Sequence, residues 1–205
     1  MINTNSPKAS AWNASTGGHS PYSIFFNMIH PLPEKAIEII DKGTFPITIE
    51  KGRFLIKPGN TTDHYYLILK GVIRAYIKED GKEITTWIND ENEIVGSIRG
   101  LALNVPCEEY LQAIETTNLI GIPYKLVEQL YETFPEANII GRKILEQSYR
   151  DAEERAFICR IPSAEKRYKR FVETRPRLIN RVSLKYIASY LGMTNETLSR
   201  VRSRM

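Results

Sequence analysis

The chain has 205 residues, of which 42% are hydrophobic and 25% are charged, values typical of a globular protein. No apolar run approaches the ~20 residues that cross a bilayer, and the N-terminus lacks a signal-peptide pattern, which argues against a membrane partner and predicts a cytoplasmic protein. The net charge of +4 is unevenly distributed, because residues 1–134 sum to −4 and residues 135–205 to +8. A basic C-terminal third is expected of a domain that binds a polyanion. The alternative is a well-solvated helical surface.

Two short helices are predicted after an irregular N-terminal segment. Residues 1–21 are rich in Asn, Ser, Thr, Gly and Pro without an apolar period, and they predict a flexible tail. A short helix is expected over residues 22–29. A second helix is expected to begin at Pro33 and to end at Gly43, because Pro suits the first helical turn and Gly the end.

Residues 45–123 show a β pattern. Apolar and polar side chains alternate in several short runs, and turn residues separate these runs at regular spacing. Residues 57–60 form one predicted turn, and Asp80-Gly81 marks the tight reversal of a hairpin. The pattern predicts an antiparallel barrel or sandwich, and residues 22–134 are expected to form one domain.

The period becomes helical after the predicted barrel. Residues 124–134 place their apolar side chains on one helical face, and Pro135 marks a boundary before a long helix over residues 136–159. Apolar and small residues recur along one side of that helix at steps of three and four. This stripe consists of Ile140, Ile144, Ser148, Ala152, Ala156 and Cys159. We expect residues 135–160 to be a dimerisation helix, because a long helix leaving a β domain can bury its stripe against a second copy; packing on its own barrel is the alternative.

A break and a basic helix follow. Ile161-Pro162 should interrupt the long helix and form a hinge, because Pro lacks the backbone donor and restricts the residue before it. Ser163 has the chemistry of an N-cap for a helix over residues 164–174. This helix contains Lys166, Arg167, Lys169 and Arg170.

The segment from Ser183 to the C-terminus has the pattern of a helix-turn-helix. Ser183 can cap a first helix, Gly192 suits a left-handed turn at its end, and Thr194 can cap a second helix. Leu198 and Val201 should point inward from that second helix. The interior positions of the first helix are Leu184, Ile187, Ala188 and Leu191, of which Ala188 allows a close crossing.

The polar face of the second helix has the chemistry needed to read a DNA groove. Arg can donate two bonds to guanine, Asn can pair with adenine, and Glu can accept from cytosine. Hydroxyl groups near a helix N-terminus suit phosphate oxygens. The predicted DNA-binding residues are Thr194, Asn195, Glu196, Thr197, Ser199, Arg200 and Arg202. An ordinary exposed helix pair is the alternative.

The order of a β barrel, a long helix and a terminal helix-turn-helix resembles the Crp/Fnr family of transcription regulators. Residues 66–74 (YLILKGVIR) are similar to the family's central barrel strands and glycine turn, and residues 187–201 (IASYLGMTNETLSRV) to its DNA-reading motif. The resemblance covers residues 22–205. It implies an α+β fold with an N-terminal antiparallel barrel of jelly-roll type (residues 22–134, the effector domain), the dimerisation helix, and a winged-helix-type DNA-binding domain over residues 161–205.

The resemblance also implies roles for single residues. Asn195, Glu196 and Arg200 occupy the recognition-helix positions that read bases. Glu196 and Arg200 match the family pattern, whereas Asn195 stands where a basic residue is common. We therefore expect a sequence preference that differs from that of the family's founding member.

The barrel departs from the family pattern where cyclic nucleotides bind. Members that bind them have a Gly-Glu pair for the ribose and, further on, an Arg-Ala or Arg-Ser pair for the phosphate. The matching window here has no Glu after its glycine and no Arg at the second site, and Arg99 could substitute only in a rearranged loop. The candidate effector pocket consists of Gly96, Ser97, Ile98, Arg99, Cys107, Glu108 and Glu109. Because a cyclic phosphate needs a cation or several N–H donors, cyclic nucleotides are predicted to bind weakly or not at all.

Three functions are therefore compared. The first is a sequence-specific DNA-binding regulator with an unknown small-molecule effector, and the second is a regulator that responds to cyclic nucleotides. The third, a cupin-type metal enzyme, is disfavoured because His64 is the single barrel histidine. The expected partners are a palindromic double-stranded operator and a second copy through residues 136–159, with RNA polymerase as a further candidate.

Cysteine and histidine usage predicts neither a metal centre nor a cofactor. Cys107 and Cys159 do not form a disulfide framework or an iron–sulfur spacing, and the three histidines lack ligand spacing. We expect both cysteines to be buried, reduced thiols, since free Cys is usually buried. No catalytic residue is predicted.

Overall fold

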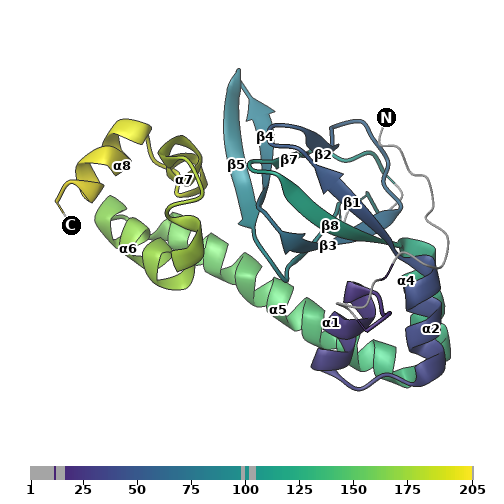
Figure 1. The fold of residues 1–205 in the computed structure, drawn as a ribbon. Coiled ribbons are helices and arrows are strands. Elements are labelled where there is room, and N and C mark those ends of the chain that lie inside the picture. The colour runs from purple at the N-terminus through teal and green to yellow at the C-terminus, as the bar shows by residue number, and fades with distance from the viewer. Residues whose placement is uncertain (1–11, 13–16, 98–99, 102–104, 205) are drawn as a thin grey trace.

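Two antiparallel four-stranded sheets, a long helix and a C-terminal group of helices make up the chain (Figure 1). The computed structural model describes residues 12, 17–97, 100–101 and 105–204. The helices are α1 (Pro21–Ile29), α2 (Glu34–Gly43), α4 (Tyr124–Thr133), α5 (Pro135–Arg160), α6 (Ala164–Thr174), the short 3-10 helix η2 (Pro176–Leu178), α7 (Leu184–Tyr190) and α8 (Asn195–Arg202). The strands are β1 (Phe45–Ile49), β2 (Phe54–Ile56), β3 (His64–Lys70), β4 (Ile73–Glu79), β5 (Lys82–Asn89), β6 (Ile94–Val95), β7 (Tyr110–Ala113) and β8 (Thr117–Pro123). The predicted α+β fold is confirmed.

The two sheets enclose an apolar core. One sheet has the strand order β1-β8-β3-β6 and the other β2-β7-β4-β5, and the neighbouring strands are antiparallel. Alternate side chains from both sheets, such as Ile68, Ile73, Leu111 and Leu119, form one buried cluster. The β4–β5 hairpin turns at Asp80-Gly81, where both residues have positive φ (48° and 74°), as the sequence predicted.

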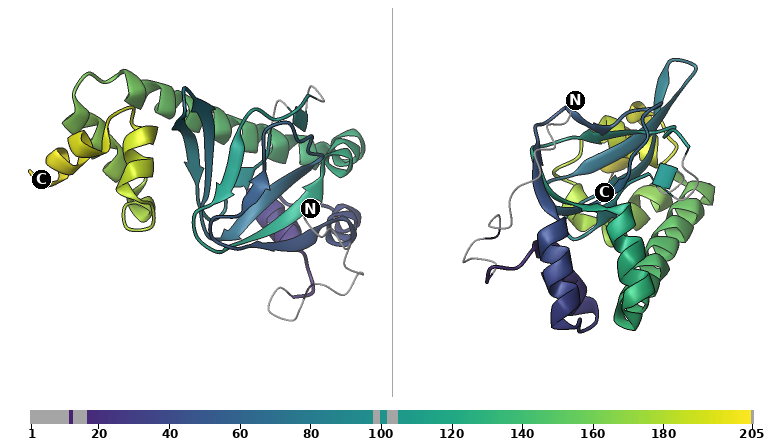
Figure 2. Two further views of the ribbon diagram at one scale, coloured as in Figure 1. Left: turned by 90° about the horizontal axis from the view of Figure 1, so that it is seen from above. Right: turned by 90° about the vertical axis from the view of Figure 1, so that its right-hand side faces the viewer.

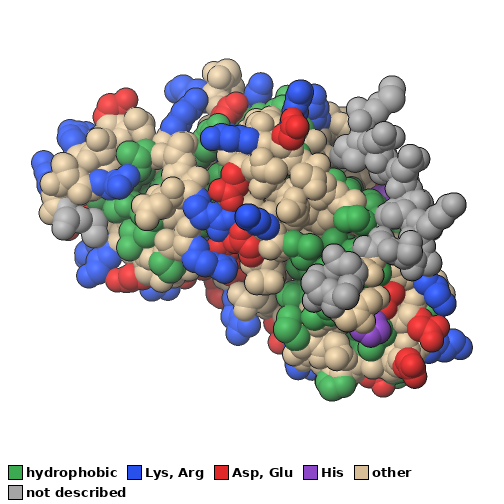
Figure 3. All heavy atoms as spheres, in the orientation of Figure 1, with side chains coloured by type: hydrophobic (Ala, Val, Ile, Leu, Met, Phe, Trp, Pro, Cys, Tyr) green, Lys and Arg blue, Asp and Glu red, His purple; other side chains and the backbone are tan. Residues whose placement is uncertain are grey.

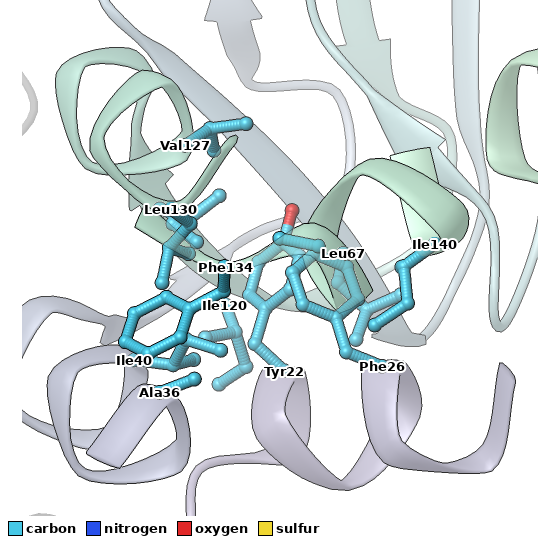
Figure 4. Close-up of a cluster of buried hydrophobic side chains, with 12 residues drawn as sticks. Tyr22, Phe26, Ala36, Ile40, Leu67, Ile120, Val127, Leu130, Phe134 and Ile140 are labelled. Atoms are coloured by element: carbon cyan, nitrogen blue, oxygen red, sulfur yellow. The ribbon is translucent and has the colours of Figure 1, made fainter. Parts of the chain in front are cut away.

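A helical layer closes one end of the sheets. Helices α1, α2 and α4 and the first turns of α5 surround a second apolar cluster that includes Leu67 and Ile120 from the strands (Figure 4). Tyr22 and Phe26 of α1 lie edge to face in this cluster, with ring centroids 5.2 Å apart. The first turns of α5 are therefore fixed to the barrel of the same chain.

The described part of the predicted tail is held against α2. The Ser20 backbone N–H donates to Asp41 Oδ1 (2.7 Å), and the Ser20 hydroxyl caps α1. The Trp12 indole N–H donates to the Asp41 carbonyl (2.9 Å), and His19 Nδ1 lies 2.7 Å from Asp41 Oδ2. Trp12, His19 and Ser20 thus contact Asp41, whose acceptors the local sequence pattern does not reveal.

The C-terminal helices lie at the far end of α5 from α1 and α2 (Figure 2). Residues 161–204 contain no strand, so the wing expected from the family resemblance is not formed in this part of the chain. Their core also includes Ile158 of α5 and two barrel residues, Val72 and Ile88. The predicted domain boundary at residue 161 therefore cuts through one apolar core. Among the described helices, none has the length and apolar character of a membrane span.

Candidate nucleic-acid interface

Helices α7 and α8 form the predicted helix-turn-helix. Helix α7 ends in a turn at Gly192, whose φ of +63° is the left-handed conformation that favours glycine. The Thr194 hydroxyl accepts a hydrogen bond from the Thr197 backbone N–H (3.2 Å) and so caps α8. Ser183 precedes α7 in extended conformation but forms no such side-chain cap, so that part of the prediction is wrong.

The inner faces of both helices are fully packed. Ile187, Ala188, Leu191 and Leu198 are each at most 1% exposed. Val201, one turn after Leu198, is half-buried. The small side chain of Ala188 is buried in the same cluster as Leu198 of α8. Since the buried side anchors α8, its opposite side is held in a fixed direction.

The opposite side of α8 presents the predicted reading residues to solvent. Asn195, Glu196, Ser199, Arg200 and Arg202 are exposed, and neither arginine forms an ion pair within the described part of the chain. The pKa of Glu196 is lowered, first because its own backbone N–H donates to the carboxylate and then because the neighbouring cap hydroxyl does. Glu196 is therefore ionised at neutral pH and can act only as an acceptor.

The hydroxyl residues of this surface lie at the N-terminus of α8. Thr194 is exposed and Thr197 is half-buried, with their hydroxyl oxygens 3.1 Å apart. A helix N-terminus has free backbone donors and a partial positive charge, which together suit a phosphate oxygen. Helix α8 therefore combines an anion-binding end with a polar face of donors and acceptors.

The described residues in the first part of the barrel window are Gly96 and Ser97. Ser97 is 7% exposed, and its hydroxyl accepts from the Gly100 backbone N–H (3.1 Å). Gly96 is covered by the Tyr65 ring, which would lie 3.1 Å from an added Cβ. Ile98 and Arg99 of the predicted pocket lie outside the described residues. The Ser97 side chain is thus used within its own turn.

The second part of the window contains two carboxylates, those of Glu108 and Glu109. Glu109 is half-buried and accepts from the Thr86 hydroxyl (2.5 Å) and the Trp87 indole N–H (3.3 Å) of β5. Cys107 is buried, and its backbone N–H donates to the Asn60 carbonyl. Glu108 is exposed. The described residues of the window 96–109 include no Lys or Arg, so they offer no side-chain cation to a phosphate.

The apolar stripe of α5 differs from the predicted one in its first half. Ile140 is buried and Ile144 half-buried against the helical layer of the same chain, so these two residues are not available to a second copy. The exposed stripe has a different phase and consists of Leu145, Tyr149, Ala152, Ala156 and Cys159. Its steps alternate between four and three residues, the spacing of a two-stranded coiled-coil seam. Leu145 and Tyr149 lie outside the predicted stripe, but their positions fit a seven-residue repeat with Ala152, Ala156 and Cys159.

Two further features distinguish this face of α5. Leu145 and Tyr149 are 64% and 72% exposed, which is unusual for large apolar side chains. They line an open groove of about 820 Å³ with Tyr131 of α4. Cys159 is exposed, which corrects the prediction that both thiols are buried; Ile158 occupies the buried position beside it.

The described residues include no candidate metal site. No group of three or more His, Cys, Asp or Glu side chains lies in an arrangement suited to a metal ion among them. His64, the barrel histidine, contacts Asp63 (2.5 Å) and the rings of Phe45 and Tyr66.

Comparisons with known proteins give matches to the barrel alone and to most of the chain. Residues 46–134 match the family model described as the cyclic nucleotide-binding domain. The chain is 26% identical to the transcriptional activator protein Anr of Pseudomonas protegens over 179 residues, 82% of this chain and 71% of that protein. It is 28% identical to the fumarate and nitrate reduction regulatory protein of Vibrio cholerae over 168 residues, 76% of this chain and 66% of that protein. These relatives are transcription regulators rather than enzymes.

The fold is shared with solved structures. FixK2 from Bradyrhizobium japonicum superposes with a TM-score of 0.69 at 18% identity, covering 78% of this chain and 83% of FixK2. The regulator CLP of Xanthomonas campestris, described as responsive to c-di-GMP, superposes with a TM-score of 0.65 at 20% identity, covering 84% of this chain and 91% of CLP. At such identities the likeness establishes the arrangement of barrel, long helix and C-terminal helices.

Proposed function

The chain belongs to the Crp/Fnr family of transcription regulators, and on that premise we propose that it binds a palindromic operator as a homodimer without a cyclic nucleotide as its effector. One observation carries the proposal. The reading face of α8 is exposed and polar, while its opposite face is buried in the C-terminal core. A helix mounted in this way can enter the major groove.

Three residues of α8 are proposed to read bases. Arg200 can donate two bonds to a guanine edge, Asn195 can pair with adenine, and the ionised Glu196 can accept from cytosine. Arg202 and the hydroxyl groups of Thr194, Thr197 and Ser199 are proposed to contact phosphates. Phosphate contacts fix the register of the protein on DNA, whereas base contacts supply the sequence preference.

The exposed stripe of α5 supports the proposal of a dimer. Two copies of α5 in parallel would bury Leu145 and Tyr149 and let the small Ala152 and Ala156 approach closely. A twofold axis along α5 would present α8 twice, which matches the symmetry of a palindrome. The exposed stripe begins at Leu145, after the first turns of α5 that pack on the barrel of the same chain. Contacts with a second copy and contacts with the barrel can therefore form together.

The geometry of the barrel window argues against a cyclic-nucleotide effector. A bound cyclic phosphate would need a cation, while the described window offers the carboxylates of Glu108 and Glu109. The Glu109 carboxylate is moreover committed to Thr86 and Trp87. The alternative, a cyclic-nucleotide-responsive regulator, requires a phosphate site that these residues do not form.

Selection of operators from random duplexes tests the central proposal. The full chain should enrich a palindrome whose half-site centres are about 34 Å apart, one turn of DNA. Its affinity should fall steeply as salt rises, because phosphate contacts release counterions. Enrichment of no sequence above background would contradict the proposed function.

Oxidative cross-linking tests the proposed dimer seam. Cys159 is exposed at the end of the proposed seam, and its thiol lies 3.8 Å from the Tyr190 carbonyl of the same chain. If the thiol turns from this contact, the two copies of Cys159 in the proposed dimer would come within reach of a disulfide. A mild oxidant should give a covalent dimer with the wild-type chain and with Cys107→Ser, but not with Cys159→Ser. A dimer in ultracentrifugation that never cross-links would place the interface elsewhere.

A further inference from the structure

The helix-turn-helix is fixed to the outer face of the barrel. Four kinds of contact join the two parts, namely an apolar core, hydrogen bonds to a free strand edge, a buried arginine and a group of ion pairs. We propose that the outer face of β4–β5 and the loop 90–93 set the direction of the reading helix, with Arg74 and Arg181 as positioning residues that determine which half-site spacing the dimer accepts. The inference rests on the proposed function.

The apolar contact makes the two parts continuous. Val72 and Ile88 of the barrel are buried in the same cluster as Ile187 and Leu198 of the helix-turn-helix. The cluster also contains Ile158, from the last turns of α5. Any reorientation of α7 and α8 would therefore expose apolar surface to water, which is unfavourable in proportion to its area.

Helix α7 also binds the free edge of a sheet. Strand β5 is the edge strand of its sheet, so its outer backbone groups have no neighbouring strand. Ser189 of α7 supplies the missing partners, since its hydroxyl accepts from the Thr85 backbone N–H (2.9 Å) and donates to the Glu83 carbonyl (3.1 Å). This pair of bonds fixes the position of α7 along β5.

Arg74 of β4 is the largest fully buried side chain of the interface, at 1% exposed. Its guanidinium lies over the ring of Tyr186 in α7 (3.9 Å to the centroid) and over the ring of Tyr76 (4.3 Å). It donates to the Thr85 hydroxyl and to the Glu83 carboxylate, both at 2.8 Å. Because a guanidinium is planar and stacks on rings, this arrangement restrains the angle of α7 as well as its position.

Ion pairs hold the segment between α6 and α7 to the loop after β5. Arg181 forms a bidentate pair with Glu91 (2.6 and 2.8 Å) and also donates to Glu115. Arg177 pairs with Asp90 (2.9 Å) and Arg175 with Glu93 (2.5 Å). Figure 3 shows blue and red side chains gathered between the C-terminal helices and the barrel.

The acidic loop is itself immobilised. Glu91 accepts from the Gly71 backbone N–H (2.8 Å), and Gly71 has a φ of +113° with Thr117 Cα 2.6 Å from where a Cβ would lie. Only glycine fits there, so the β3–β4 connection holds Glu91 at a fixed place. The hydrogen bonds from Arg181 are the main reason that the pKa of Glu91 is lowered to about 2, so the pair is ionic at neutral pH.

A fixed direction of α8 has a measurable consequence for a dimer. Two rigidly mounted reading helices can reach both half-sites at one spacing only. Changing the spacing by one base pair rotates one half-site by about 35° around the DNA axis. A loosened helix-turn-helix would follow that rotation, whereas affinity for a single half-site would not change.

The test compares duplexes in which the half-sites of the selected operator are one base pair closer, at the selected distance, and one base pair further apart. The wild-type chain should lose at least about tenfold in affinity at either altered spacing, because simultaneous engagement is then lost. Tyr186→Leu and Arg181→Met should each reduce this loss to about threefold or less, with unchanged affinity for an isolated half-site. Neither residue is proposed to contact DNA.

Matched variants separate positioning from general damage. Tyr186→Phe keeps the ring under Arg74 and should retain the wild-type spacing preference. Arg53→Met, which removes an exposed barrel arginine outside the interface, should also retain it. If the Tyr186→Leu and Arg181→Met variants both fold and both lose as much affinity as the wild-type chain at the altered spacings, the inference is overturned. Failure of the wild-type chain to select any operator would contradict the proposed function instead.

Discussion

The likeness to Crp/Fnr regulators predicts two ligand-facing regions in this chain, the barrel window and the helix-turn-helix, and the two differ in chemistry. On α8, the side chains of Asn195, Glu196 and Arg200 are exposed to solvent. In the window, Ser97 closes on its own turn and Glu109 binds β5. Helix α8 presents the side chains that the proposed DNA contacts need, whereas the described window residues offer no side-chain cation for the phosphate of a cyclic nucleotide.

The difference shows that the fold and the ligand depend on separate residues. The barrel backbone is determined by buried side chains such as Ile68 and Leu119, which pack equally well whatever lies in the window. Ligand chemistry depends on a few charged or polar groups that contribute little to the core. Variants of both regions, and of the contacts that hold them, would sharpen or break this contrast.

Loss of the α5 seam should have the largest effect. Tyr149→Asp places a carboxylate on the exposed stripe, so the chain should become monomeric and lose about 100-fold or more in operator affinity, since the second half-site then binds independently. Gel shift and analytical ultracentrifugation measure both quantities. Gln147→Asp places the same charge on the opposite side of α5 and should leave the dimer intact; equal effects of both variants would argue against the seam.

Removal of a base-reading residue should have the next largest effect. Arg200→Ala should weaken binding to the selected operator by about 1–3 kcal/mol, because a bidentate contact to a base is lost. Affinity for random DNA should change much less. Competition assays with both DNAs measure the two values, and an equal loss on every sequence would assign Arg200 to phosphate contact instead.

The two caps of the helix-turn-helix should differ in stability. Thr194→Ala removes the hydroxyl that accepts from the Thr197 N–H and should lower the free energy of unfolding by about 1 kcal/mol. Ser183→Ala should change it by much less, because the Ser183 side chain forms no cap bond. Chemical unfolding measures both variants, with Thr194→Ser as the control that retains the cap.

The pH dependence of stability should report on the contact between barrel and helix-turn-helix. The pKa of Glu91 is lowered from 4.5 to about 2, chiefly by Arg181, so its stabilising contribution is present above the ordinary value and is lost as the pH falls through about 2. The difference in unfolding free energy between the wild-type chain and Glu91→Gln should stay constant from about pH 8 to about pH 5 and shrink below about pH 4.5. A difference that grows on acidification would contradict the ionic pair.

Cyclic AMP should have no effect at all. Because the described window supplies no cation to a cyclic phosphate, cAMP and cGMP should change neither the melting temperature nor the operator affinity. Calorimetry and gel shift with each nucleotide measure this. Binding at low micromolar concentration would show that the window forms a phosphate site by other means and would remove the contrast between the two regions.

The sequence by itself determined the elements whose signals are local. The Asp80-Gly81 turn, the left-handed Gly192 and the Thr194 cap are each decided by the conformational preference of one or two residues, and all three lie where they were predicted. The apolar faces of α7 and α8 followed from helical periodicity. The reading residues of α8 were then identified as the remaining, polar side of a helix.

Only the tertiary structure decided which surfaces meet. The stripe predicted on α5 began with Ile140, but the helical layer of the same chain covers that residue and leaves Leu145 and Tyr149 exposed instead. Likewise, nothing in the local pattern pairs Arg181 with Glu91, or Arg74 with Tyr186, because each pair is separated by about 90 residues or more along the chain. Such contacts arise when distant elements are brought together by the burial of a shared core, and this is why the orientation of the helix-turn-helix on the barrel could be seen only in the folded chain.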